Sequence, residues 1–186
     1  MIARTEFILG GQKCGKSRRA EQLAQQWLTD APDHRALFIA TATPWDDEMV
    51  ARITRHQQDR AERVPGMRTL EEPLALGEAI AANSAAHTLI VVDCLTLWLT
   101  NLLMPAEGQP PVDAAVQIAG LLHAVGQSAG PVVLVGNEIG LGVIPMGREV
   151  RAFVDALGRL NQDVAAACER VTLMVAGLPL TLKGAP

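Results

Sequence analysis

The sequence predicts an α/β protein in which helices cover both faces of a mainly parallel central sheet. Three observations support this prediction. Five short apolar runs recur along the 186 residues. Each run is apolar throughout rather than alternating, as expected of strands that are covered on both faces. The segments between the runs repeat apolar residues with a helical period, and strands that alternate with helices favour a parallel sheet with right-handed crossovers.

Each apolar run is about one strand long. The expected strands are residues 6–10, 36–40, 89–93, 132–136 and 171–176, with a weaker edge strand at 68–70. Apolar stripes predict a helix after residue 17 and a long helix from about 150 to 168. An acidic start after Pro44 predicts another over 46–57. A helix over 95–103 is apolar nearly all round, which indicates deep burial or a subunit interface.

Length and composition restrict the class of protein. The length fits one domain over residues 1–186, in which 64–66 and 105–111 are looser stretches and the second is a surface loop. The net charge of -4 favours neither nucleic acid nor an anionic membrane as a partner. No apolar run approaches the roughly 18 residues that span a bilayer, and the start of the chain lacks a signal-peptide pattern. We therefore expect a soluble, cytoplasmic protein.

The strongest local signal is the segment GGQKCGKS, which matches the phosphate-binding pattern G-x-x-x-x-G-K-[ST]. Its glycines let the backbone curl so that N–H groups point at phosphate oxygens. The lysine would neutralise the β- and γ-phosphates, the serine hydroxyl would bind Mg²⁺, and the following helix adds its positive end. Strand, loop and helix together predict a P-loop NTPase-like three-layer sandwich. The loop consists of Gly10, Gly11, Gln12, Lys13, Cys14, Gly15, Lys16 and Ser17.

Asp93 closes the apolar run at 89–93. A carboxylate at the end of a buried strand beside a P-loop usually holds Mg²⁺, directly or through water. It also suits the N-cap of the helix that follows. We favour the metal role, because the P-loop creates a need for a carboxylate.

His56 follows Met49 and Ile53 at helical spacing, so it lies on the apolar stripe of its helix. On this pattern alone a partly buried structural histidine is favoured. The functional alternative is a nucleophile, because a neutral imidazole can attack phosphorus and form a phosphoramidate. Nearby Arg52, Arg55 and Arg60 could pair with phosphates or form a solvated face.

Polar residues and glycines also follow the run at 132–136, in the segment NEIGLG over residues 137–142. Ligands bind at the carboxyl ends of strands in α/β sheets, which favours a functional segment. The glycines are equally typical of a turn. The pattern leaves both interpretations open.

Taken as an ordered set, these motifs resemble the bifunctional adenosylcobinamide kinase/adenosylcobinamide-phosphate guanylyltransferases of cobalamin biosynthesis. The resemblance runs over nearly the whole chain. It is carried by the P-loop, DDEM at 46–49 leading to His56, TLEEP at 69–73, TNLL at 100–103, VGNEIGLGVIP at 135–145 and GRLNQ at 158–162. The P-loop is widespread, whereas the DDEM and NEIGLGVIP segments are much more specific.

The resemblance implies two reactions, phosphorylation of adenosylcobinamide with ATP or GTP and then transfer of GMP from GTP to the resulting phosphate. It also implies a GMP–histidine intermediate at His56, which reverses our preference for a structural histidine. Mg²⁺ with GTP and ATP, and a homo-oligomer, possibly a trimer, are expected as well. Beyond the P-loop, the residues that match nucleotide-binding positions are Thr41, Ala42, Thr43, Gln57, Arg60, Glu71 and Asp93.

Two other functions compete with this one. A monofunctional P-loop small-molecule kinase would leave His56 structural. A non-catalytic nucleotide switch is the weakest alternative, because Lys16, Ser17 and Asp93 form the set that phosphoryl transfer needs.

Overall fold

The computed structural model describes residues 2–44, 47–105, 108 and 111–185 and, of Glu48 and Arg52, the backbone alone. The described residues form one seven-stranded sheet in the order β3-β2-β4-β5-β1-β6-β7. Its strands are parallel except for the antiparallel pair β6–β7. The strands are β1 (Thr5–Gly10), β2 (Arg35–Ala40), β3 (Arg68–Glu71), β4 (Thr88–Asp93), β5 (Val132–Val135), β6 (Arg170–Val175) and β7 (Leu178–Lys183).

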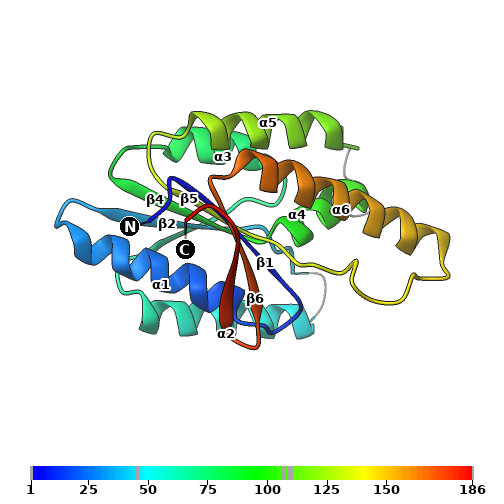
Figure 1. The fold of residues 1–186 in the computed structure, drawn as a ribbon, viewed down its shortest axis with the longest axis horizontal. Helices are drawn as coiled ribbons and strands as arrows, with labels where there is room; N and C mark the ends of the chain where they lie inside the picture. Colours follow the sequence, from blue (N-terminus) through cyan, green and yellow to red (C-terminus); the bar gives the residue numbers. More distant parts are fainter. Residues whose placement is uncertain (1, 45–46, 106–107, 109–110, 186) are drawn as a thin grey trace.

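Helices cover both faces of the sheet, as Figure 1 shows. One layer holds α1 (Lys16–Asp30) and α2 (Asp47–Arg63). The other holds α3 (Leu76–Asn83), α4 (Leu95–Leu103), α5 (Ala114–Gln127) and α6 (Arg148–Ala167). This confirms the predicted three-layer α/β sandwich. No helix among the described residues is long and apolar enough to cross a membrane.

The central strands are buried because both of their faces pack on helices. Along β1, Phe7 and Leu9 join the cluster under α3–α6, whereas Ile8 joins the cluster under α1. Successive residues of a strand point to opposite faces, so a strand between two helical layers favours apolar residues on both faces. This preference explains the continuous apolar runs of the sequence.

Parallel strands place all their carboxyl ends on one edge of the sheet. The P-loop follows β1, Asp93 ends β4, and Asn137 lies just beyond β5. Register fixes their relative heights, since Asp93 is the partner of Ala40 on one side and of Val135 on the other. Motifs far apart in the sequence therefore meet at this edge.

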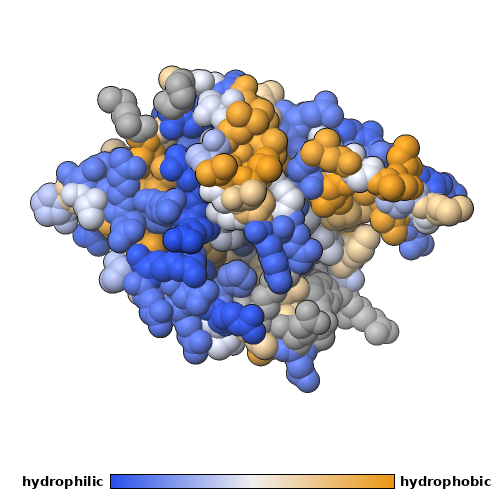
Figure 2. All heavy atoms as spheres, turned by 60° about the horizontal axis from the view of Figure 1, so that its bottom comes forward, coloured by the Kyte–Doolittle hydropathy of each residue, from blue (hydrophilic) through white to orange (hydrophobic). Residues whose placement is uncertain are grey.

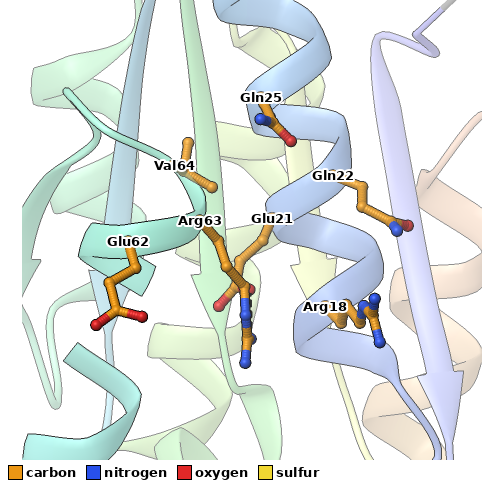
Figure 3. Close-up of a pocket in the computed structure, with 7 residues that line it drawn as sticks. All are labelled: Arg18, Glu21, Gln22, Gln25, Glu62, Arg63 and Val64. Atoms are coloured by element: carbon orange, nitrogen blue, oxygen red, sulfur yellow. Dashed lines mark hydrogen bonds and ion pairs between the residues drawn. The ribbon is translucent and has the colours of Figure 1, made fainter. Parts of the chain in front are cut away.

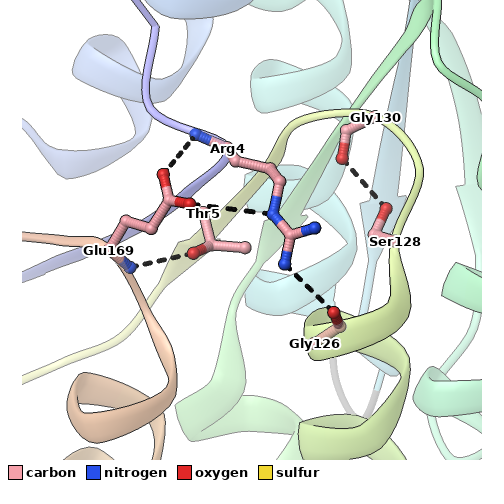
Figure 4. A network of polar contacts seen from close by, with 6 residues as sticks. All are labelled: Arg4, Thr5, Gly126, Ser128, Gly130 and Glu169. Carbon is pink, nitrogen blue, oxygen red and sulfur yellow. Dashed lines mark hydrogen bonds and ion pairs between the residues drawn. The ribbon is translucent and has the colours of Figure 1, made fainter.

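The opposite edge of the sheet is fixed by polar contacts (Figure 4). Arg4 donates through Nη2 to the Gly126 carbonyl at 3.1 Å, and its backbone N–H donates to Glu169 at 3.0 Å. The backbone N–H of Glu169 in turn donates to the Thr5 hydroxyl at 2.9 Å. These contacts join the ends of α5 and α6 to the start of β1, so the sheet is fixed at the edge away from the P-loop.

Four points need correction or refinement. The hairpin strand β7 was not predicted. Its turn uses Ala176 and Gly177 with φ of 52° and 82°, a conformation that only the glycine signals in sequence. Helices α3 and α5 are short or weakly patterned and were not singled out.

Of the two alternatives for α4, deep burial is confirmed, because Trp98 and Leu99 are 0% and 1% exposed. The predicted loop at 105–111 lies partly outside the described residues.

A close approach of α3 to α5 gives a stability test. A Cβ on Gly77 would lie 2.7 Å from the Gly120 carbonyl carbon, whereas a Cβ on Gly120 would meet nothing within 4 Å. We expect Gly77→Ala to lower the free energy of unfolding by about 1–3 kcal/mol through overpacking. Gly120→Ala, the matched control, should raise it by about 0.5–1 kcal/mol through helix propensity. Urea denaturation measures both, and equal effects would contradict this account.

Candidate active site

The P-loop joins β1 to α1 and can be formed only with glycine at its first position. Gly10 has φ +150°, and a Cβ there would lie 2.6 Å from the Met174 carbonyl oxygen and 2.5 Å from Cys14 Sγ. Gly15, at φ +105°, is the N-cap of α1. The loop and the helix start are therefore those that the sequence predicts.

Lys16 lies inside the curve of this loop. It is 8% exposed, and its Nζ donates to the carbonyl oxygens of Gly10 at 3.0 Å and Gly11 at 2.6 Å. A buried ammonium needs such partners, because an unpaired one would carry a large desolvation cost. The same ammonium is the cation that the motif assigns to the phosphates.

Ser17 and Asp93 meet at the start of α1. The Ser17 hydroxyl donates to Asp93 Oδ2 at 2.6 Å. The N-cap of α4 is Cys94, which makes no side-chain cap hydrogen bond, so the capping alternative for Asp93 is wrong. A hydroxyl and a carboxylate oxygen side by side at a P-loop are the hard oxygen ligands that Mg²⁺ takes, and these two residues therefore fit the ion.

The segment after β2 is held by hydrogen bonds to α4 and β4. The Thr41 hydroxyl donates to the Cys94 carbonyl at 2.7 Å and accepts from the Cys94 N–H at 2.8 Å. Asn101 is 5% exposed and donates to the carbonyls of Thr41 and Pro73. It also accepts from the Thr43 hydroxyl at 3.4 Å. Sequence reasoning gave Asn101 no role, although a single amide in a largely apolar helix is the signal that could have found it.

His56 lies on α2 and is exposed, so the partly buried position that its apolar stripe favoured is wrong, while its role as a nucleophile stays a prediction. It shares one face of the helix with Arg60 and Arg63, which follow at i+4 and i+7. The neighbouring Gln57 donates to Glu71, the last residue of β3, at 3.5 Å. His56 therefore lies level with the carboxyl edge of the sheet, where the P-loop is.

The last turns of α2 are fixed to the body of the protein by two arginines. Arg60 is 5% exposed, with its guanidinium 3.7 Å above the Phe38 ring, and it donates to the Thr69 hydroxyl at 3.2 Å. Burial lowers the pKa of Arg60, while the charges of Glu21 and Asp93 oppose that shift. Arg60 therefore sits in the field of the carboxylate beside Ser17, about 6 Å along the helix axis from His56.

Arg63 joins α2 to the P-loop helix. Its Nη1 lies 3.0 Å from Oε2 of Glu21, a residue of α1 that is 4% exposed. The hydrogen bond and the charge of Glu21 raise the pKa of Arg63. Figure 3 shows these two side chains side by side in the groove between the helices. Sequence reasoning assigned Glu21 no role, because nothing in its local pattern names a partner 42 residues away.

Cys94, next to Asp93, does not compete with His56 as a nucleophile. Burial raises the pKa of the Cys94 thiol to about 11. Thiols react as thiolates, so this one is inert at neutral pH. Of the other predicted phosphate partners, Arg55 is exposed and the side chain of Arg52 lies outside the described residues, as does Asp46 of the DDEM segment.

The segment after β5 contacts the P-loop directly. The backbone N–H of Glu138 donates to the Gly10 carbonyl at 3.1 Å, and that of Asn137 donates to the Thr96 hydroxyl at 2.9 Å. The Glu138 carboxylate accepts from the Gly140 N–H at 2.6 Å. The turn is therefore confirmed, whereas a functional role of the segment stays a prediction, although the segment lies against the P-loop.

The α1–α2 link gives a second stability test. We expect Arg63→Met to lower the free energy of unfolding by about 1–2 kcal/mol, because it leaves the nearly buried Glu21 carboxylate without its charged hydrogen bond. Asp59 pairs with the same arginine at 3.1 Å but is exposed. Asp59→Asn, the control, should cost less than about 0.5 kcal/mol. Thermal and urea unfolding of both variants measure the difference, and a costlier control would contradict the assignment.

Comparison with known proteins identifies the family of this chain. The chain is 46% identical over 181 residues to the bifunctional adenosylcobalamin biosynthesis protein CobP of Pseudomonas aeruginosa, covering 97% of this chain and 98% of that one. It is 37% identical over 189 residues to CobU of Salmonella typhimurium, covering 95% and 98%. The flagellar accessory protein FlaH of Methanocaldococcus jannaschii shares the fold, with a TM-score of 0.55 at 11% identity over 98% of this chain and 80% of that one. Residues 6–182 match the model of cobinamide kinase / cobinamide phosphate guanyltransferase, and the chain belongs to that family of transferases.

Proposed function

We propose that the two reactions of this family use one nucleotide site in this chain, the P-loop site, and that His56 carries GMP in the second reaction. The observation that carries the proposal is the position of His56. It is exposed, on the face of α2 whose Arg60 lies in the field of Asp93. Asp93 in turn contacts Ser17 of the P-loop. A monofunctional kinase would not need a free imidazole at this edge.

The first reaction phosphorylates the hydroxyl of adenosylcobinamide. The hydroxyl oxygen attacks the γ-phosphorus of ATP or GTP, and the bond from that phosphorus to the β–γ bridging oxygen breaks. Lys16 and the loop N–H groups stabilise the charge that develops on the leaving diphosphate. In such a transfer, catalysis comes mostly from positioning the reacting groups and stabilising the developing charge.

The second reaction moves GMP in two displacements. A ring nitrogen of His56 attacks the α-phosphorus of GTP, and pyrophosphate leaves. A phosphate oxygen of adenosylcobinamide phosphate then attacks the same phosphorus and releases His56, giving adenosylcobinamide-GDP. A covalent intermediate splits one difficult transfer into two easier ones. The same lysine and loop amides serve the departing pyrophosphate.

Mg²⁺ belongs to this proposal as the ion that Ser17 and Asp93 would hold. When bound it neutralises phosphate charge beside Lys16. The nucleotide would lie along the P-loop, with Thr41, Ala42 and Thr43 on one side and Gln57, Arg60 and Glu71 nearby. Arg60 is already engaged with Phe38 and Thr69, so its support for the nucleotide is mainly electrostatic.

A labelling experiment tests the role of His56. The protein and its His56→Ala variant are incubated with Mg²⁺ and GTP labelled at the α-phosphate and are then denatured. We expect acid-labile, alkali-stable label on the native protein and none on the variant. The variant should keep the kinase reaction, since that reaction does not use the imidazole.

The kinase rate of the variant is therefore the control for folding. Label on His56→Ala at the native level would place the nucleophile elsewhere. No label on either protein, with nucleotide binding intact, would leave a monofunctional kinase with a structural His56.

The proposal includes a homo-oligomer, for which a trimer is the expected state, in the cytoplasm. Its support is an apolar surface on the segment between β5 and α6, where Leu141, Val143, Ile144 and Met146 are 85%, 97%, 77% and 95% exposed. Figure 2 shows apolar atoms toward this end of the molecule and a second group near the middle of the same face. Patches of this kind usually mark contact sites.

Size-exclusion chromatography with light scattering tests the assembly. We expect the wild-type protein to have the mass of a trimer and a Val143→Asp/Ile144→Asp variant to dissociate, because buried carboxylates in an apolar contact are costly. Val116, 63% exposed on α5, gives the control variant Val116→Asp, which should stay assembled. A monomeric wild-type protein would contradict the proposal.

A further inference from the structure

We propose that Glu138 is the catalytic base of the kinase reaction, accepting the proton of the substrate hydroxyl as it attacks the γ-phosphorus, and that it has no such role in GMP transfer. This inference rests on the proposed function, because it needs both reactions to use the P-loop site. It assigns a chemical role to the segment after β5, which the two reactions described above leave unused.

The position of Glu138 is fixed by a shared acceptor. The Gly10 carbonyl oxygen accepts from the Glu138 N–H at 3.1 Å and from Lys16 Nζ at 3.0 Å. Lys16 is the cation for the β- and γ-phosphates, so Glu138 lies one hydrogen-bonded atom away from it. Since β5 is the neighbour of both β1 and β4, Glu138 emerges between the P-loop and the strand that carries Asp93.

The carboxylate itself is oriented by the turn that follows it. Oε1 accepts from the Gly140 N–H at 2.6 Å, and the side chain is half-buried. A carboxylate has a second oxygen, Oε2, which is the atom we assign to the proton. A base that is held by a backbone contact needs little reorganisation during the reaction.

The two acceptors differ in whether they need a base. The alcohol of adenosylcobinamide holds its proton at neutral pH, so its oxygen must lose that proton as the new O–P bond forms. The proton passes to Glu138 Oε2 while the diphosphate takes the electrons of the breaking bond. The acceptor of GMP is a phosphate monoester, whose second pKa is about 6, so it is already an anion. A base at Glu138 therefore serves the first reaction only.

The other charged groups at this edge have different tasks. Asp93 accepts from Ser17 and is the carboxylate that fits Mg²⁺. Lys16 is a cation and cannot accept a proton. His56 lies on α2, on the other side of the site from β5. Glu72 is also a half-buried carboxylate at this edge, but it follows the edge strand β3, which β2, β4 and β5 separate from β1 and the P-loop.

The test compares Glu138→Gln with the wild-type protein in two separate assays. One follows phosphorylation of adenosylcobinamide by MgATP, and the other follows GMP transfer from MgGTP to adenosylcobinamide phosphate. The glutamine keeps an oxygen for the Gly140 N–H but cannot take a proton. We expect kcat of the kinase reaction to fall by about 100-fold or more, the size of a general-base contribution, with GMP transfer changed less than about threefold.

Three controls make the result decisive. Glu72→Gln removes a carboxylate of the same kind at the same edge and should keep both rates. Glu138→Asp keeps a base one methylene shorter and should recover part of the kinase rate that Glu138→Gln loses. Glu138→Ala also removes the contact to Gly140, so a purely structural role predicts that it is impaired in both reactions while Glu138→Gln resembles wild type.

A Glu138→Gln variant with an unchanged kinase rate would overturn this inference alone. Equal losses in both reactions would overturn it too, because they would mean that Glu138 positions the P-loop rather than accepting a proton. A wild-type protein inactive in both assays would overturn the proposed function and this inference with it.

Discussion

The carbonyl oxygen of Gly10 is the point on which the site depends. It accepts from the ammonium of Lys16 and from the N–H of Glu138, so one atom at the end of β1 orients both the phosphate-binding cation and the segment after β5. This is possible only because Gly10 lacks a Cβ, which would collide with Met174 and Cys14. The parallel sheet supplies the rest by bringing the ends of β1, β4 and β5 to one edge.

The second constraint is the attachment of α2. Arg60 and Arg63 fix its last turns to β2, β3 and α1, and His56 extends from that fixed end toward the carboxyl edge. A P-loop presents one set of phosphate positions, yet the two reactions break bonds at two different phosphorus atoms. In the proposed arrangement the acceptor lies at the β5 side and the imidazole at α2, so that the two phosphorus atoms would be reached from opposite sides of one bound nucleotide.

Much of this arrangement could be predicted from the sequence, because its causes are local. A continuous apolar run predicts a strand between two layers, and the P-loop motif predicts its own curl and a helix directly after it. The contact between Ser17 and Asp93 was also predictable, since parallel strands bring their ends together. The ordered motifs are specific enough to identify the family from the sequence alone.

What failed depends on contacts between distant segments. The exposure of His56 could not be predicted, because an apolar stripe does not show how far along a helix the packing against the rest of the protein extends. The partners of Glu21 and Asn101 lie tens of residues away, and their pairing is set by how α1, α2 and α4 pack. The strand β7 was missed because Pro179 is atypical of a strand, although it is tolerated on an edge.

The central claim is that a single nucleotide site serves both reactions. It is tested most directly by the binding stoichiometry of two non-hydrolysable analogues, one of ATP and one of GTP, measured separately and in competition with Mg²⁺ present. The account predicts one bound nucleotide per chain in total, with each analogue displacing the other completely. Simultaneous binding of both analogues to the same chain would contradict it and would require a second nucleotide site.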